Sequence, residues 1–297
     1  RRCSDDFAAP VFDGAFSKSP PHVLRAPCGN QGGRGEGYHP YWHQTPSPTH
    51  SPHRSRGGAR ATTPMLGPMS EALQLHRATL DNGMRVVVNP DTTSPGVAVN
   101  MWYRVGSADE EPGHFGFAHL FEHLMFSGTT SGIASSEHLA TIESVGGSAN
   151  ASTSFDRTNY FETVPAGALE LALWLEAERL AHLAVTEANL ATQREVVKEE
   201  KRQRYDNTPY GDLFDLLLDG RFGGEHPYGH PTIGSVPDLD AACLDDVTAF
   251  HSTWYRPDNA VLVISGCVEA DEGLTLADKY LGAVPAATGD LPERIQG

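Results

Sequence analysis

The chain has 297 residues, of which 39% are hydrophobic and 20% are charged, and its formal net charge at pH 7 is −16. This length allows one large domain or two small ones with a substantial core. No run of eighteen apolar residues occurs, which excludes a membrane-spanning helix, and the negative charge argues against nucleic acid as the main partner. Four scattered cysteines without a Cys-x-x-Cys pair exclude a disulfide scaffold and a thiolate zinc site.

The first 68 residues differ in composition from the rest of the chain. They contain ten prolines and nine glycines, and the net charge divides into +4 for residues 1–68 and −20 for residues 69–297. This stretch shows neither helical nor strand periodicity, so we predict a disordered Pro/Gly-rich tail. The chain starts with Arg1, and Met69 lies where the ordered pattern begins. The tail is therefore either sequence upstream of a true start, which is not translated, or a genuine disordered extension.

From residue 70 onward, strands and helices follow each other at short intervals. The segment 79–88 is typical of a strand, an Asn-Gly turn and a second strand, and residues 97–105 form a further strand rich in Val and aromatic residues. Apolar periodicity predicts helices at 116–126 and 136–145. Residues 149–155 and 160–164 flank a turn and predict a hairpin.

Two long helices are predicted at 167–183 and 186–204, and the short turn between them predicts that they pack as antiparallel neighbours. Within the first helix, Glu176 and Arg179 are interpreted as an ordinary surface pair. The remaining expected elements are helices at 211–219, 244–254 and 270–281, a strand at 259–265 and a Gly/Pro-rich loop at 223–237. Because hairpins and helices are interleaved, we predict an α+β fold with a mostly antiparallel sheet covered by helices. We expect residues 69–285 to form one domain and residues 286–297 to begin a linker to a second half that the chain lacks.

The sharpest motif is His119-Leu120-Phe121-Glu122-His123. On a helix, His119 and His123 lie one turn apart on the same face, as two ligands of a zinc ion must. Glu122 lies at the edge of that face, where it can take a proton from metal-bound water. This His-x-x-Glu-His order is the inverzincin signature. The alternative interpretation is a helix with two solvated or core histidines.

A catalytic zinc site has three protein ligands and one open position. The segment 193–200 holds three glutamates, and only one can face the metal, because neighbouring residues on a helix point about 100° apart. Glu200 shares its face with the apolar Leu190 and Val197, whereas Glu199 shares its side with polar residues. A carboxylate on a buried face needs a partner, and a cation satisfies it. We therefore predict Glu200 as the third ligand.

Four stretches occur in order along the chain: Gly106-Ser107-x-Asp109-Glu110, Gly116-Phe117-Ala118-His119-Leu120-Phe121-Glu122-His123, Asn150-Ala151-Ser152-Thr153-Ser154 and His226-Pro227-Tyr228-Gly229. This ordered set resembles the M16 (pitrilysin/insulinase) family of zinc metallopeptidases, and the resemblance covers about residues 73–285, the length of the family's amino-terminal catalytic domain. It implies a zinc-dependent endopeptidase domain that hydrolyses peptides or unfolded polypeptide segments through metal-activated water.

The resemblance also implies roles for single residues. In this family both motif histidines and a distant glutamate bind one zinc ion, and the motif glutamate is the general base. Carried over, this implies one Zn²⁺ per chain on His119, His123 and Glu200, with Glu122 as the base; Glu200 follows His123 by 77 residues, as in the family. Family members usually have another glutamate seven residues before the third ligand, which helps to hold the site. Here that position is Gln193, which can form a hydrogen bond but brings no charge, and we predict it to support the ligands.

Asn150, Ala151, Ser152 and Thr153 are predicted to bind substrate. The segment 150–155 alternates small and polar residues beside the hairpin, which suits an edge strand that receives an extended peptide. The alternative is an ordinary exposed hairpin. The resemblance implies two similar halves that close around the peptide, so we expect a second M16-like half or a homologous subunit as a partner. The chain would then be a fragment or a half-length subunit.

Two other functions stay open at this point. A non-catalytic partner or scaffold subunit of an M16-type heteromeric peptidase would typically have lost motif residues, and all four site positions are intact here. A structural zinc site would have four protein ligands, and the sequence indicates no fourth. No targeting signal is readable, so we expect a cytoplasmic location; the uncertain start of the protein leaves periplasmic, secreted and organellar locations open.

Overall fold

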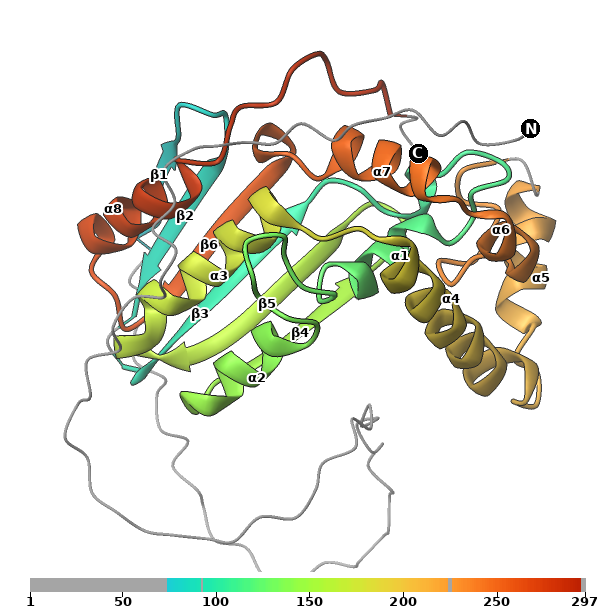
Figure 1. Ribbon diagram of the computed structural model, residues 1–297, viewed down its shortest axis with the longest axis horizontal. Helices are drawn as coiled ribbons and strands as arrows, with labels where there is room; N and C mark the ends of the chain where they lie inside the picture. The colour runs from blue at the N-terminus through green and yellow to red at the C-terminus, as the bar shows by residue number, and fades with distance from the viewer. Residues whose placement is uncertain (1–73, 92, 224–225, 295–297) are drawn as a thin grey trace, which may run out of the picture. The chain divides into compact units, whose positions relative to one another are not determined.

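The computed structural model describes residues 74–91, 93–223 and 226–294. The predicted tail, residues 1–68, and the domain start at residue 69 lie outside the described residues. Within them, the strands form a six-stranded sheet in the order β1-β2-β6-β3-β5-β4 (Figure 1). The strands are β1 (His76–Thr79), β2 (Arg85–Pro90), β3 (Gly96–Tyr103), β4 (Ser148–Thr153), β5 (Thr158–Pro165) and β6 (Ala260–Gly266).

The pairing of the strands confirms the predicted α+β fold with a mostly antiparallel sheet. In this described sheet, β2 and β6 run parallel, and the other neighbouring strands run antiparallel. β3 lies in the centre, with Met101 opposite Tyr160 on β5 and opposite Leu262 on β6. β4 lies at one edge of the sheet, and among the described strands it pairs with β5 alone.

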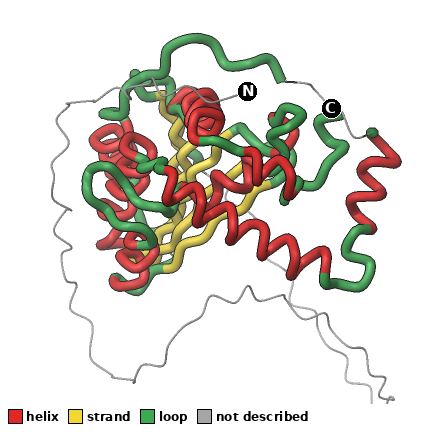
Figure 2. Tube along the Cα trace, turned by 45° about the vertical axis from the view of Figure 1, so that its right-hand side comes forward, coloured by secondary structure: helices red, strands yellow, loops and turns green. Residues whose placement is uncertain are grey.

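Helices cover the sheet (Figure 2). Every second residue of β3 and β6 is buried, including Val99, Met101, Leu262 and Ile264, as expected for strands with one face against a core. Two of the helices, α3 and α8, pack against each other and against the strands. The helices are α1 (Phe117–Leu124), α2 (Glu137–Ser144), α3 (Leu169–His182), α4 (Glu187–Lys201), α5 (Leu213–Phe222), α6 (Val236–Ala241), α7 (Leu244–Trp254) and α8 (Ala270–Leu281).

The predicted antiparallel packing of the two long helices is wrong. α3 packs on the sheet and on α8, whereas α4 leaves the sheet and packs on α1 and α6 (Figure 1). The connection between the two helices is extended: the N–H of Ala184 donates to the carbonyl of Gly128, and Leu183 forms an isolated bridge with Thr129. These bonds tie the connection to a distant loop and turn the chain away from α3. The prediction rested on the length of the connection alone, so it did not include them.

The predicted helices at 244–254 and 270–281 coincide with α7 and α8. The six-residue α6 lies partly within the predicted loop 223–237 and was missed, because it is too short for an apolar period to be read. Its start carries a local signal that could have been used: the Ser235 side chain accepts a hydrogen bond from the N–H of Asp238, and Pro237 lies in the first turn. In the described part of the chain, no helix combines the length and apolar character needed to cross a bilayer.

Candidate metal centre

The start of α1 is held by a buried carboxylate. The side chain of Glu110 accepts hydrogen bonds from the backbone N–H groups of Gly116, at 2.7 Å, and Ala118, at 2.8 Å. These groups would otherwise lack partners at a helix start, where a carboxylate also meets the positive end of the helix dipole. Gly116 has φ 107°, a conformation that favours glycine. The stretch that ends at Glu110 therefore orients the helix that carries His119.

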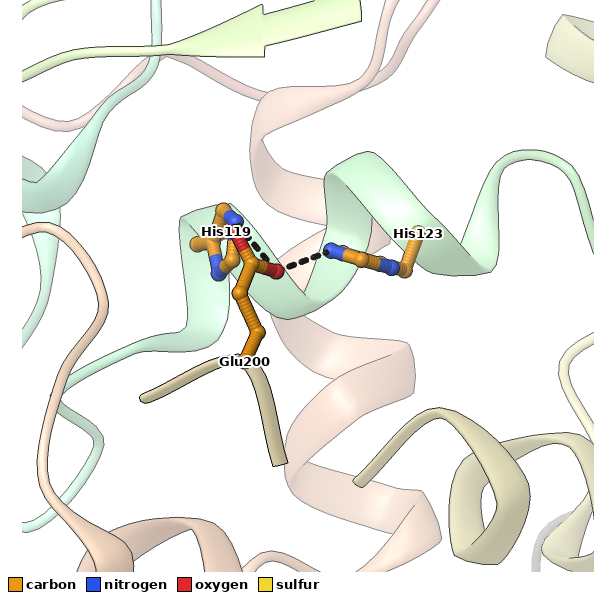
Figure 3. Close-up of side chains that lie close together, drawn as sticks. All are labelled: His119, His123 and Glu200. Atoms are coloured by element: carbon orange, nitrogen blue, oxygen red, sulfur yellow. Dashed lines mark ion pairs between the residues drawn. The ribbon is translucent and has the colours of Figure 1, made fainter. Parts of the chain in front are cut away.

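The structure brings the three predicted ligands together (Figure 3). His119 and His123 project from the same side of α1, and Glu200 reaches them from the last turn of α4. One oxygen of Glu200, Oε2, lies 3.6 Å from Nε2 of His119 and 3.3 Å from Nε2 of His123. The side chains are 10%, 20% and 14% exposed, in the order His119, His123 and Glu200. The site is thus nearly enclosed but open to a small ligand.

The packing of α4 agrees with the prediction of which glutamate faces the site. Leu190 and Val197 are fully buried on the side of α4 that carries Glu200, and α4 packs against α1. Glu199 has a side chain that is 52% exposed and forms an ion pair with Arg202. The helical period therefore places Glu200, rather than its neighbour, next to the two histidines.

The spacing of the three donor atoms suits a zinc ion. Zinc binds imidazole nitrogen and carboxylate oxygen at about 2.0–2.2 Å in tetrahedral geometry, which puts ligand atoms about 3.4 Å apart. The two measured separations from Glu200 Oε2 lie on either side of that value, and all three donor atoms lie within 4.8 Å of one another. Two imidazoles and one carboxylate also match the donor set of catalytic zinc sites, which leave one position open.

The protonation of these groups also suits a cation. Burial, together with the charge of His123, lowers the pKa of His119 to about 4. Burial acts to raise the pKa of Glu200, but the hydrogen bond with His123 and the charges of His119 and Arg204 outweigh it, so the net shift is downward. Near neutral pH, His119 is thus neutral and Glu200 is ionised, the states in which they bind metal.

Arg204 is a site residue that the sequence prediction missed. It lies in η3 (Arg202–Asp206), a π-helical turn that extends α4, and its Nη1 atom lies 2.7 Å from Oε1 of Glu200. The signal was available, because Arg204 follows Glu200 by four residues on a predicted helix. Gln193 is half-buried on α4, and no hydrogen bond joins it to the three ligands within the described part of the chain. Its supporting role stays a prediction.

The predicted base, Glu122, lies beside the ligands and contacts the sheet. It is 8% exposed, and its Oε2 atom accepts a hydrogen bond of 2.6 Å from the hydroxyl of Thr153 on β4. Burial raises the pKa of Glu122, while the bond from Thr153 and the charge of His123 act in the opposite direction. A raised pKa brings a carboxylate nearer to the range in which it can take and return a proton at neutral pH.

The four residues predicted to bind substrate divide between the two faces of β4. The strand is an edge strand, as predicted, so its outer edge pairs with no other described strand. Ala151 is buried and Thr153 reaches Glu122, so both lie on the side of the strand that faces α1. Asn150 is exposed, and the hydroxyl of Ser152 donates to Asn159 on the neighbouring strand. The side chains of Asn150 and Ser152 therefore lie on the opposite face.

The family model described as Insulinase (Peptidase family M16) matches residues 85–234, and the model described as Peptidase M16 inactive domain matches residues 242–296. The first match alone spans half of the chain and includes the whole site. The chain belongs to the M16 peptidase family.

Three relatives, one found by sequence and two by structure, are longer than this chain. The zinc protease PqqE of Helicobacter pylori is 37% identical over 203 residues, which are 68% of this chain and 45% of that protein. The crystal structure of a protease from Helicobacter pylori aligns with a TM-score of 0.72 at 33% identity, over 75% of this chain and 54% of that one. The periplasmic protease PqqL from Escherichia coli aligns with a TM-score of 0.67 at 24% identity, over 74% and 25%, which supports the fold alone. This chain spans about half the length of the curated relatives it matches.

The structure also contains a second group of His and Glu side chains inside the M16 domain. His138, Glu162 and Glu176 have donor atoms within 4.8 Å of one another, and all three are buried. Beside them, Arg179 forms a two-point ion pair with Glu176, and its side chain is 3% exposed. The interpretation of Glu176 and Arg179 as an ordinary surface pair is therefore wrong. The signal was present in α3, whose apolar residues surround the helix on nearly all sides, as is typical of a buried helix.

Proposed function

We propose that this domain is the zinc-binding half of a metalloendopeptidase that hydrolyses peptides or unfolded polypeptide segments. The observation that carries the proposal is the convergence of His119, His123 and Glu200, with the acid-base candidate Glu122 beside them and a free strand edge next to Glu122. Membership of a peptidase family and the zinc protease names of the relatives support it. Among the described residues, two clusters of His and Glu could hold a metal ion, and only the one with Glu200 reaches the surface. One zinc ion per chain agrees with this.

Each residue has a separate role in the proposed reaction. His119, His123 and Glu200 would hold the zinc ion, which when bound supplies a Lewis acid that polarises a peptide carbonyl and makes water more acidic. Glu122 would take a proton from the attacking water and return it to the leaving amine. Because Oε2 of Glu122 accepts the Thr153 bond, Oε1 is the oxygen that we assign to this transfer. The outer edge of β4 would align the peptide by strand addition.

We further propose that a second M16-like half or subunit completes the enzyme. The length of the relatives supports this, as does the crystal structure of a separate first half of PqqL from Escherichia coli. On α5, the side chains of Leu213, Phe214, Leu216 and Leu217 are between 49% and 62% exposed. Adjacent exposed apolar residues of this size mark interaction surfaces. We assign this face of α5 to contact with the second half.

The test is hydrolysis of a quenched fluorescent peptide library by the full chain with zinc and with a chelator. It is run with and without the part of the Helicobacter pylori protease that this chain leaves uncovered. We expect Glu122→Gln to bind zinc normally and to reduce turnover by about 10²–10⁴-fold, the usual contribution of a general acid-base group. Glu199→Gln, in an exposed glutamate of α4, is the matched control and should keep full activity. Zinc binding without hydrolysis in every arm would favour the scaffold subunit instead.

A further inference from the structure

Thr153 forms the direct link between the edge strand and the predicted base. It is the last residue of β4, and its hydroxyl donates to Oε2 of Glu122 at 2.6 Å. This length is typical of a hydroxyl bound to an ionised carboxylate, one of the stronger kinds of hydrogen bond in proteins. The two residues lie 31 positions apart, so the contact exists only because α1 packs against β4.

The surroundings of Thr153 hold its hydroxyl in place. A β-branched side chain has few χ1 rotamers, and Thr153 pairs directly with Thr158 of β5. Thr158 is fully buried, and its hydroxyl donates to the carbonyl of Val105 at 2.9 Å. The oxygen atoms of the two threonine hydroxyls lie 3.5 Å apart. Thr158 thus uses its hydrogen on Val105, and the single hydroxyl hydrogen of Thr153 is directed to Glu122.

The bond from Thr153 reaches Glu122 from the side of the sheet, whereas the three predicted ligands lie on α1 and α4. The hydrogen bond therefore fixes Oε2 of Glu122 on the sheet side of the site.

We propose that Thr153 is a positioning residue, which holds Glu122 in the orientation of a general base and ties it to the strand that receives the peptide. Its hydroxyl thus serves Glu122 rather than a substrate side chain. The proposal rests on the proposed role of Glu122. A peptide added to the edge of β4 would also restrain the strand end from which Thr153 acts.

The test compares Thr153→Val, which keeps the shape of the side chain and removes the hydroxyl, with Thr153→Ser, which keeps the hydroxyl. Both are made in the full chain. In crystal structures, we expect Glu122 to leave its position in Thr153→Val and to keep it in Thr153→Ser. In the peptide assay, Thr153→Val should lower kcat by about 10–100-fold, the usual effect of losing such a supporting contact, with KM changed by less than about twofold. Thr153→Ser should restore most of kcat.

Zinc affinity and thermal midpoint separate positioning from a structural role, and both should match the wild type in the two variants. The proposal is overturned if Glu122 keeps its position and kcat is unchanged in Thr153→Val. It is also overturned if Thr153→Val loses zinc or melts early, since Thr153 would then support the fold. If the wild type hydrolyses no peptide but Glu122 moves only in Thr153→Val, positioning holds and the proposed function fails.

Discussion

Two clusters of His and Glu side chains in this domain are equally compact but differ in the cation beside them. One contains two histidines and one glutamate, and the other contains one histidine and two glutamates. In each cluster the donor atoms lie within 4.8 Å of one another. At the surface, Glu200 faces two histidines and the half-exposed Arg204, whose charge water can screen. In the interior, the buried guanidinium of Arg179 binds Glu176 and lies over the rings of Tyr160, at 4.4 Å, and Phe126, at 5.2 Å.

The interior cluster is balanced by the protein itself. Arg179 neutralises Glu176, while burial lowers the pKa of His138 to about 3 and raises that of Glu162 to about 8. His138 and Glu162 are therefore both neutral near pH 7, and the proton of Glu162 can be donated to Nε2 of His138, 3.2 Å away. A metal ion would have to displace a guanidinium from this site without water to solvate it. Residue type and spacing alone therefore do not create a metal site. The site also needs a carboxylate whose charge no buried cation neutralises, and it must be accessible to the ion from solvent.

The largest effect is expected from Arg179→Leu. This change leaves the buried carboxylate of Glu176 without its partner, which typically costs about 3–5 kcal/mol in the free energy of unfolding. Urea unfolding of the full chain measures it. The double variant Glu176→Gln/Arg179→Met should recover much of the loss, because it removes the charge as well as the partner.

The control is the exposed pair of Lys279 and Glu170, whose side chains are 56% and 37% exposed. Lys279→Met should leave the unfolding midpoint unchanged, because exposed ion pairs contribute little to stability. Equal losses for Arg179→Leu and Lys279→Met would contradict the contrast between buried and surface charge.

A second large effect is expected at the surface cluster, in metal affinity rather than stability. Glu200→Gln removes a charged ligand, and we expect zinc affinity to fall by on the order of 100-fold or more, at least as much as the loss of a supporting contact. Competition with a chelator of known affinity measures this. Glu199→Gln should bind zinc like the wild type. A loss of zinc affinity in Glu199→Gln but not in Glu200→Gln would show that the other face of α4 carries the ligand. His138→Gln should also leave zinc affinity unchanged.

A smaller effect is expected in the pH dependence of stability. Burial raises the pKa of Glu162 from 4.5 to about 8. Between these values the folded protein keeps a proton that the unfolded chain has lost, so the free energy of unfolding falls as pH rises, by about 1.4 kcal/mol per unit. Burial lowers the pKa of His138 from 6.5 to about 3, which makes stability rise with pH over that range. The two slopes oppose each other between pH 4.5 and 6.5, and only the fall due to Glu162 continues to about pH 8.

Urea unfolding at several pH values, with chelator present so that metal binding does not contribute, measures this profile. Glu162→Gln should remove the fall above pH 6.5, by roughly 2 kcal/mol over the interval. A wild-type profile that is flat between pH 6.5 and 8 would mean that Glu162 is ionised in the folded protein. The neighbouring Glu176, whose pKa burial also raises, keeps its ion pair with Arg179 in this variant.

The elements that the sequence predicted well are those with a strong local period. The Asn-Gly turn before β2, the apolar stripes of α7 and α8 and the hairpin of β4 and β5 all depend on neighbours within a few residues. The path of α4 was predicted wrongly because hydrogen bonds from the connection to Gly128 and Thr129 decide it. The burial of Arg179 was missed because the pair was interpreted by its charges rather than by the apolar helix around it.

The sequence by itself determined the local half of the site. Two histidines four residues apart on a helix must share a face, and the period of α4 selects Glu200 over Glu199. The tertiary structure alone decided the contacts between distant segments: the meeting of α1 with α4, the bond from Thr153 to Glu122, and the meeting of Glu176 with His138 and Glu162. Local periodicity is a property of the backbone and can be read along the chain. Charge balance depends on burial and on partners far apart in sequence, and these exist only once the helices have packed.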